Sequence, residues 1–73
     1  MESKESLLAT ARRRVAEAEV RVREQATRVA DAARWGHDTT QAKAVLDVFE
    51  GTLRFLREDL ARLEASEAAQ RQP

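Results

Sequence analysis

The stretch ARWGHDTTQA, residues 33–42, holds the only tryptophan and the only histidine of the chain and one of its two glycines. The same residues have the chemistry that ends one helix and begins another. Gly36 suits the left-handed position just after a helix end, where the last carbonyl groups find partners. Asp38 is a good N-cap, and Gln41 three residues later completes a capping-box spacing. With His37 between the glycine and the aspartate, the stretch predicts a tight turn.

Long helices are expected on both sides of this turn. The chain contains 14 alanines and 11 arginines, and its single proline is the last residue. Such a composition is typical of long helices. Ser3 or Ser6 is the expected N-cap of the first helix. The expected bounds are a helix over about 4–35, a turn at 36–38, a second helix over about 39–68 and a frayed tail at 69–73. So short a connection forces the helices antiparallel, and the sequence predicts one all-α domain over 1–73, a coiled-coil-like two-helix hairpin.

A seam of apolar residues supports this pairing. In both helices these residues recur at alternating steps of three and four, which is the spacing of a coiled coil. When the two rows are paired outward from the turn, small residues of the first helix face large ones of the second, as Ala18 faces Leu56, and Gln25 is expected opposite Phe49. Three charge pairs agree with this register: Arg12 with Glu64, Glu19 with Arg57, and Arg14 with Asp59. The predicted seam consists of Leu8, Ala11, Val15, Ala18, Val22, Gln25, Val29, Ala32, Ala42, Leu46, Phe49, Leu53, Leu56, Leu60 and Leu63.

A second apolar row on the second helix cannot face the first helix. It consists of Val45, Val48, Thr52 and Phe55, and Trp35 lies near its hinge end. An exposed stripe of this kind usually marks an association surface. We expect two hairpins to pack these rows together as a homodimer, which would form a four-helix bundle. An accessory subunit that binds a different protein through the Val45, Val48 and Phe55 face is the alternative.

An arginine row occupies one stripe of the first helix. Arg14, Arg21 and Arg28 recur every seven residues, and such a stripe could contact phosphates. However, the chain balances 13 basic with 13 acidic residues, and no aromatic residue is interleaved with the arginines. A solvated face, or ion pairs to Asp47 and Asp59 of a second hairpin, is therefore favoured. A small regulatory protein that contacts nucleic acid is the alternative.

Catalytic and ligand-binding chemistry is not expected. The hinge offers His37 and Asp38, but the tip of a two-helix rod provides no cleft for a nucleophile and base. With one histidine and no cysteine there is no metal-ligand spacing, so we expect no metal, cofactor or small-molecule substrate. No apolar run is long enough to span a membrane, and the first residues lack the apolar core of a secretion signal. The expected compartment is the cytoplasm.

The stretch GHDTTQAKAVLDVFEGTLRFLREDLARL, which starts at Gly36, resembles a set of short, uncharacterised bacterial proteins. They share a G-H-D-T turn followed by a helix with the spacing A-x3-L-x2-F-x2-[ST]-L. The matching positions are Gly36, His37, Asp38, Thr39, Ala42, Leu46, Phe49, Thr52 and Leu53. The likeness covers about half of the chain. The set has no assigned activity, so the resemblance implies a helical hairpin and a contact at the face of Thr52. Together these patterns predict a non-enzymatic interaction or scaffold module that self-associates.

Overall fold

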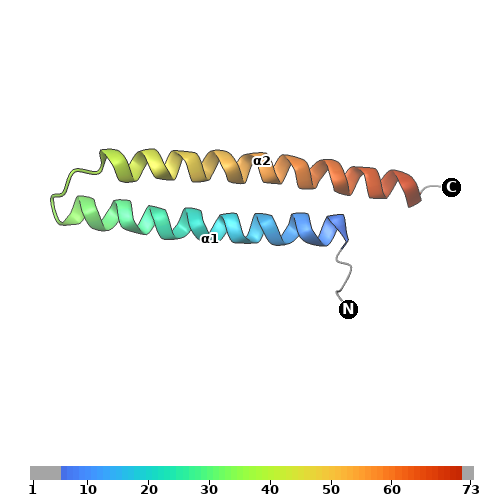
Figure 1. Ribbon diagram of the computed structural model, residues 1–73, viewed down its shortest axis with the longest axis horizontal. Helices are drawn as coiled ribbons and strands as arrows, with labels where there is room; N and C mark the ends of the chain where they lie inside the picture. The colour runs from blue at the N-terminus through green and yellow to red at the C-terminus, as the bar shows by residue number, and fades with distance from the viewer. Residues whose placement is uncertain (1–5, 72–73) are drawn as a thin grey trace.

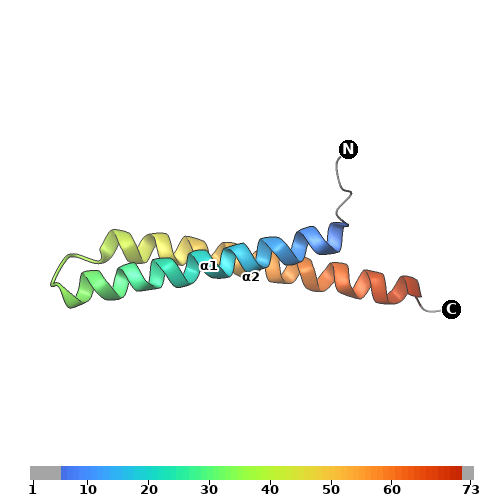
Figure 2. The same ribbon diagram turned by 90° about the horizontal axis from the view of Figure 1, so that it is seen from below.

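The computed structural model is a hairpin of two antiparallel helices, which lie side by side along most of their length (Figures 1 and 2). The structure describes residues 6–71. Helix α1 spans Leu7–Arg34 and helix α2 spans Thr40–Arg71. The predicted start of the first helix at residue 4, the alternative cap Ser3 and the end of the predicted tail at residues 72–73 lie outside the described residues. Neither described helix combines the length and the apolar character needed to cross a bilayer.

Helix α1 has a defined cap at each end. At its start the Ser6 hydroxyl accepts a hydrogen bond from the backbone N–H of Ala9 at 3.0 Å. At its end Gly36 has a φ of 76°, in the left-handed region. The N–H of His37 then donates to the carbonyl of Ala32 at 2.8 Å, and the N–H of Gly36 to Ala33 at 3.1 Å. These two bonds form a Schellman motif, which the glycine makes possible.

Helix α2 begins one residue later than predicted. The first helical backbone bond runs from Lys43 N–H to the Thr39 carbonyl at 2.9 Å, so Thr39 is the N-cap. Asp38 lies one position earlier, and its Oδ1 accepts from the N–H of Thr40 at 2.9 Å and from the Thr40 hydroxyl at 2.8 Å. Its short side chain closes a turn onto the residue two positions ahead. The predicted capping box with Gln41 is corrected, because Gln41 follows the N-cap by two residues and not three.

Helix α2 also ends later than predicted. It continues to Arg71, so residues 69–71 of the predicted frayed tail are helical. Alanine, glutamine and arginine are all good helix formers, and they fill this last turn. An ion pair of 3.3 Å between Arg71 and Glu67, four residues apart, adds to the local preference for helix.

The contact between α1 and α2 is a single layer of side chains. All fifteen predicted seam residues are buried or half-buried. The best-buried cluster joins Val15 and Ala18 of α1 to Leu53 of α2, and Val22, Leu56 and Leu60 pack against it. Small side chains on α1 and large ones on α2 allow close approach of the helices. No described side chain reaches less than 2% exposure, which reflects how little a two-helix layer can enclose.

Polar contacts along one side of this layer and within it fix the register. Arg57 Nη2 lies 3.0 Å from Glu19 Oε2, and Arg12 Nη2 lies 3.7 Å from Glu64 Oε2, as the sequence predicts. Nearer the hinge, the Gln25 amide donates to the carbonyl of Ala42 at 3.0 Å, about two helical turns from the residue predicted opposite it, Phe49. Both views show α1 extending farther toward the hinge than α2 (Figures 1 and 2).

Candidate interaction face

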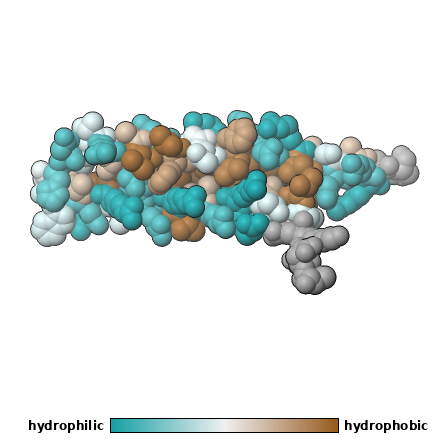
Figure 3. Space-filling view, in the orientation of Figure 1, coloured by the Kyte–Doolittle hydropathy of each residue, from teal (hydrophilic) through white to brown (hydrophobic). Residues whose placement is uncertain are grey.

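The apolar row of Val45, Val48, Thr52 and Phe55 lies on one face of α2, because steps of three and four return a helix to the same side. Val48 is 64% exposed and Phe55 60% exposed. Thr52 is also exposed, and Val45 is half-buried. Figure 3 shows apolar side chains gathered over α2 on one face of the hairpin, beside hydrophilic side chains over α1. The predicted row is therefore a contiguous face that the hairpin itself leaves largely uncovered.

A shallow hollow joins this row to α1. It has a volume of about 120 Å³ and is lined by Ala18, Arg21, Val48, Phe49 and Thr52. This volume is well below the roughly 300 Å³ at which ligand pockets begin. Because Arg21 and Val48 share the hollow, the arginine row and the apolar row belong to the same face. The hollow also shows that Arg21 lies level with the stretch from Val48 to Thr52.

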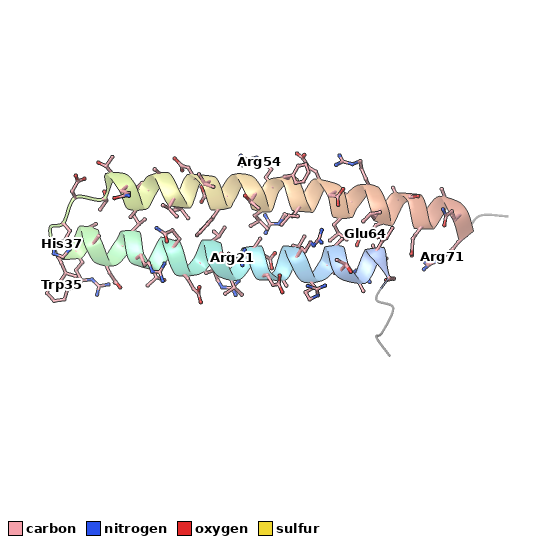
Figure 4. The ribbon with its side chains drawn as sticks, viewed as in Figure 1. Arg21, Trp35, His37, Arg54, Glu64 and Arg71 are labelled. Atoms are coloured by element: carbon pink, nitrogen blue, oxygen red, sulfur yellow. The ribbon has the colours of Figure 1, made fainter. Side chains whose placement is uncertain are left out.

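The arginine row of Arg14, Arg21 and Arg28 runs along α1 beside the apolar row, and Figure 4 labels Arg21. All three side chains are exposed. None of them makes an ion pair with any residue between 6 and 71. Arg28 donates from Nη1 to the Gln25 side-chain oxygen at 3.3 Å, a neutral partner. The guanidinium charges of this row are thus not neutralised within the described hairpin.

One predicted partner of the row is paired elsewhere. We expected Asp59 to neutralise Arg14, but Asp59 Oδ1 lies 3.7 Å from Arg62 Nη2 on its own helix. Residues three apart on a helix are neighbours, so the local pair needs no reach across the seam. Arg14 accordingly remains without an acidic partner among the described residues.

The outer edge of α2, which consists of Asp47, Gly51, Arg54 and Glu58, faces away from α1 (Figure 4, where Arg54 is labelled). A hollow on the opposite side of the hairpin from the apolar row includes Arg54 and Glu58 in its lining. The guanidinium of Arg54 lies over Gly51, since a Cβ at that glycine would be 3.8 Å from Arg54 Nη2. Neither Asp47 nor Glu58 forms an ion pair within the described part of the chain. From the sequence we named Asp47 as a partner for the arginine row but did not name Glu58. Glu58 follows Asp47 by eleven residues, or about three helical turns, so the two carboxylates lie on the same side of α2.

The hinge residues have structural contacts. Trp35 is the C-cap of α1 and its side chain is 70% exposed, at the hinge end of the hairpin (Figure 4). His37 is exposed and contributes its backbone N–H to the cap. The Asp38 carboxylate accepts a hydrogen bond from the backbone N–H of Thr40, which has the larger effect, and a second one from the Thr40 hydroxyl. These bonds lower the pKa of Asp38 below its usual value of 3.8. The hinge thus commits its one carboxylate to holding the turn.

Among residues 6–71, no three histidine, aspartate or glutamate side chains are grouped so that they could hold a metal ion. Comparisons of the chain with protein-family models, with curated proteins and with solved structures gave no significant match. The choice of the face formed by the apolar and arginine rows as the candidate site therefore rests on the exposure and charge of its own residues.

Proposed function

We propose that this protein is a non-enzymatic interaction module in which two hairpins associate through their apolar rows into a four-helix dimer. The observation that carries the proposal is the exposure of Val48 and Phe55 on a row with the spacing of a helix–helix seam. Exposed apolar side chains in such a row are more stable when a second helix removes them from water.

The thin core of the single hairpin supports the same proposal. Its buried apolar residues are Ala11, Val15, Ala18 and Leu53, two of which are alanines. Long helices in water depend on packing of an apolar face for most of their stability. A second hairpin on the apolar row would add a second layer of contacts to α2, where the larger side chains are.

A non-enzymatic role accords with the chemistry of the hinge. Catalysis by His37 or Asp38 would require a nucleophile, a base and a cleft in mutual contact. Both hinge side chains are exposed, and the Asp38 carboxylate is held by Thr40. We therefore assign the hinge to folding and the long face to function.

Sedimentation equilibrium of a matched pair of variants tests self-association. Phe55→Glu places a charge in the apolar row, whereas Val20→Glu places the same charge at a 40% exposed valine of α1 outside the row. We expect the unmutated chain and the Val20→Glu variant to be dimers, and the Phe55→Glu variant to be a helical monomer. An unmutated chain that is monomeric and fully folded at micromolar concentration would overturn the proposal.

The unneutralised arginine row supports a second candidate function, which is contact with nucleic-acid phosphates. A gel-shift titration of double-stranded DNA and single-stranded RNA at two salt concentrations tests it. Micromolar binding that weakens steeply with salt and is lost in Arg21→Glu/Arg28→Glu would support this candidate. Arg23→Glu, which changes an exposed arginine outside the row, is the control. No binding at low salt would eliminate it and leave the dimer, or a different protein on the same apolar row.

A further inference from the structure

We infer that the two hairpins associate in parallel, with both hinges at the same end, and that the arginine row of each copy pairs with Asp47 and Glu58 on the outer edge of the other. This inference rests on the proposed self-association and assigns its geometry. It follows from the order of three stripes on the molecule. Around α2, the apolar row lies between the side that faces α1, whose arginine row shares a hollow with it, and the outer edge, which follows farther around the helix.

Symmetry allows two ways to place one apolar row on another. In a homodimer the same patch is used by both copies. If α2 runs parallel to α2 of the partner, the twofold axis lies along the helices, and α1 of each copy faces the outer edge of the other. If the two run antiparallel, α1 faces α1 and outer edge faces outer edge. The parallel arrangement places the arginines of one copy opposite the carboxylates of the other. The antiparallel arrangement places arginines opposite arginines and carboxylates opposite carboxylates.

The levels along the helices match in the parallel arrangement. Arg21 lies level with Val48–Thr52, as their shared hollow shows. Arg28 is two turns closer to the hinge and Arg14 two turns farther from it, each about 10 Å away along the axis. An in-register parallel pair therefore brings Asp47 of the partner near the level of Arg28, and Glu58 of the partner near the level of Arg14. Side chains of α1 lean away from the hinge and those of α2 lean toward it, which reduces the offset that remains along the helix axes between Arg28 and Asp47 of the partner.

One residue works against this pairing and sharpens its test. Arg54 lies between the two carboxylates of the outer edge, with its guanidinium over Gly51. In the parallel pair this position faces Arg21 of the other copy, so two positive charges meet there. Replacing Arg54 by an acid would convert a repulsion into an attraction.

A charge-swap mixing experiment tests the inference. The acidic-row variant carries Arg14→Glu and Arg28→Glu, and the basic-edge variant carries Asp47→Lys and Glu58→Lys. In a dimer of either variant alone, charges of the same sign face each other at both contacts, the one at positions 14 and 58 and the one at positions 28 and 47. We therefore expect each variant to dimerise roughly tenfold or more weakly than the unmutated chain. A mixture of the two restores opposite charges at every contact. Native mass spectrometry should therefore find mainly heterodimer. Arg23→Glu, which changes an exposed charge outside both stripes, should change dimerisation little.

Further substitutions separate the two orientations. In the parallel pair, Arg54→Glu should tighten the dimer a few-fold, whereas edge-to-edge packing predicts a weaker dimer. The chain has no cysteine, so Gln41→Cys, one turn before Val45 on the same face, is a clean cross-linking probe. Parallel copies place the two position-41 sulfurs near each other, and mild oxidation should link them. Antiparallel copies place them at opposite ends.

The outcomes distinguish this inference from the proposed function. Dimers in which the acidic-row variant prefers the unmutated chain, and in which Gln41→Cys does not cross-link, would overturn the parallel geometry and leave self-association intact. Dimers that are indifferent to all four charge changes would also overturn it. Absence of any dimer in the unmutated chain would overturn both proposals.

Discussion

The side chain of Gln25 donates a hydrogen bond to the backbone carbonyl of Ala42 at 3.0 Å and so joins α1 to α2 near the hinge. Gln25 is 5% exposed and is the one polar residue buried within the described chain. Its side-chain oxygen accepts from Arg28 at 3.3 Å, so both ends of the amide have partners. A buried amide satisfied in this way specifies register more than it adds stability.

Two substitutions at position 25 separate shape from hydrogen bonding. Gln25→Ala removes both bonds and leaves a cavity, and we expect it to lower the free energy of unfolding by about 1–3 kcal/mol. Gln25→Leu keeps much of the volume and buries apolar atoms, so it should lie within about 1 kcal/mol of the unmutated chain. Urea unfolding monitored by circular dichroism measures both. If leucine proves as costly as alanine, the hydrogen bond to Ala42 dominates and the reasoning from volume is wrong.

The same substitution at the two glycines should have opposite effects. Gly36→Ala meets no atom within 4 Å, so its cost comes from the φ of 76° alone, about 1–2 kcal/mol. Gly51→Ala lies inside α2, where the new methyl group would be 3.8 Å from Arg54, an ordinary contact. It should raise the free energy of unfolding by about 0.5–1 kcal/mol, because alanine loses less backbone entropy in a helix. Thermal melts at one fixed protein concentration compare the two variants. Destabilisation by Gly51→Ala would show that its backbone is closely approached in the dimer.

The ion pair between Glu19 and Arg57 should contribute little and should depend on salt. Its two side chains are 39% and 58% exposed, so water screens the interaction. A double-mutant cycle with Glu19→Ala and Arg57→Ala should give a coupling of about 0.2–1 kcal/mol that shrinks as salt is raised. Arg12 and Glu64, at 3.7 Å, provide a weaker reference pair. A larger and salt-insensitive coupling would mean that association buries the Glu19–Arg57 side of the hairpin.

Most of the hairpin follows from local rules that the sequence states directly. The seam could be predicted because steps of three and four force residues such as Val15 and Leu53 onto one face, whatever surrounds them. The position of Gly36 could be predicted because a left-handed C′ residue is most often glycine. The pairs Arg12–Glu64 and Glu19–Arg57 followed because the seam fixes which charged residues flank it.

Predictions that depended on a choice between near neighbours were less accurate. Asp38 and Thr39 are both good N-caps, and the contact of Asp38 with Thr40 decides for Thr39. Asp59 had an arginine on each helix within reach, and the one on its own helix was closer. What binds the apolar row is a second chain, so rules about the folding of one hairpin could not identify it.

The cap at Asp38 should make the stability of the hinge depend on pH in acid. The backbone N–H of Thr40, and to a smaller extent its hydroxyl, stabilise the ionised carboxylate in the folded chain. The pKa of Asp38 in the folded chain therefore lies below the unfolded value near 3.8. A group of this kind stabilises the fold at pH values above its unfolded pKa, and the contribution is lost as pH falls through the folded pKa. The unmutated chain should therefore exceed Asp38→Ala in stability by a constant amount from neutral pH to about pH 5, and the difference should shrink below about pH 4.

Carboxyl NMR titration measures the same effect at the group itself. The pKa of Asp38 should be below 3.8 in the folded chain, and Thr40→Ala should move it only part of the way back, because the backbone N–H remains and is the larger cause. Thr27→Ala is the control, since its hydroxyl donates to the backbone carbonyl of Arg23 and to no carboxylate of the described residues. A pKa of Asp38 that is unaltered by Thr40→Ala, together with a stability difference that persists unchanged in strong acid, would contradict the assignment of this carboxylate to the hinge. The turn would then depend on Gly36 and its two backbone bonds alone.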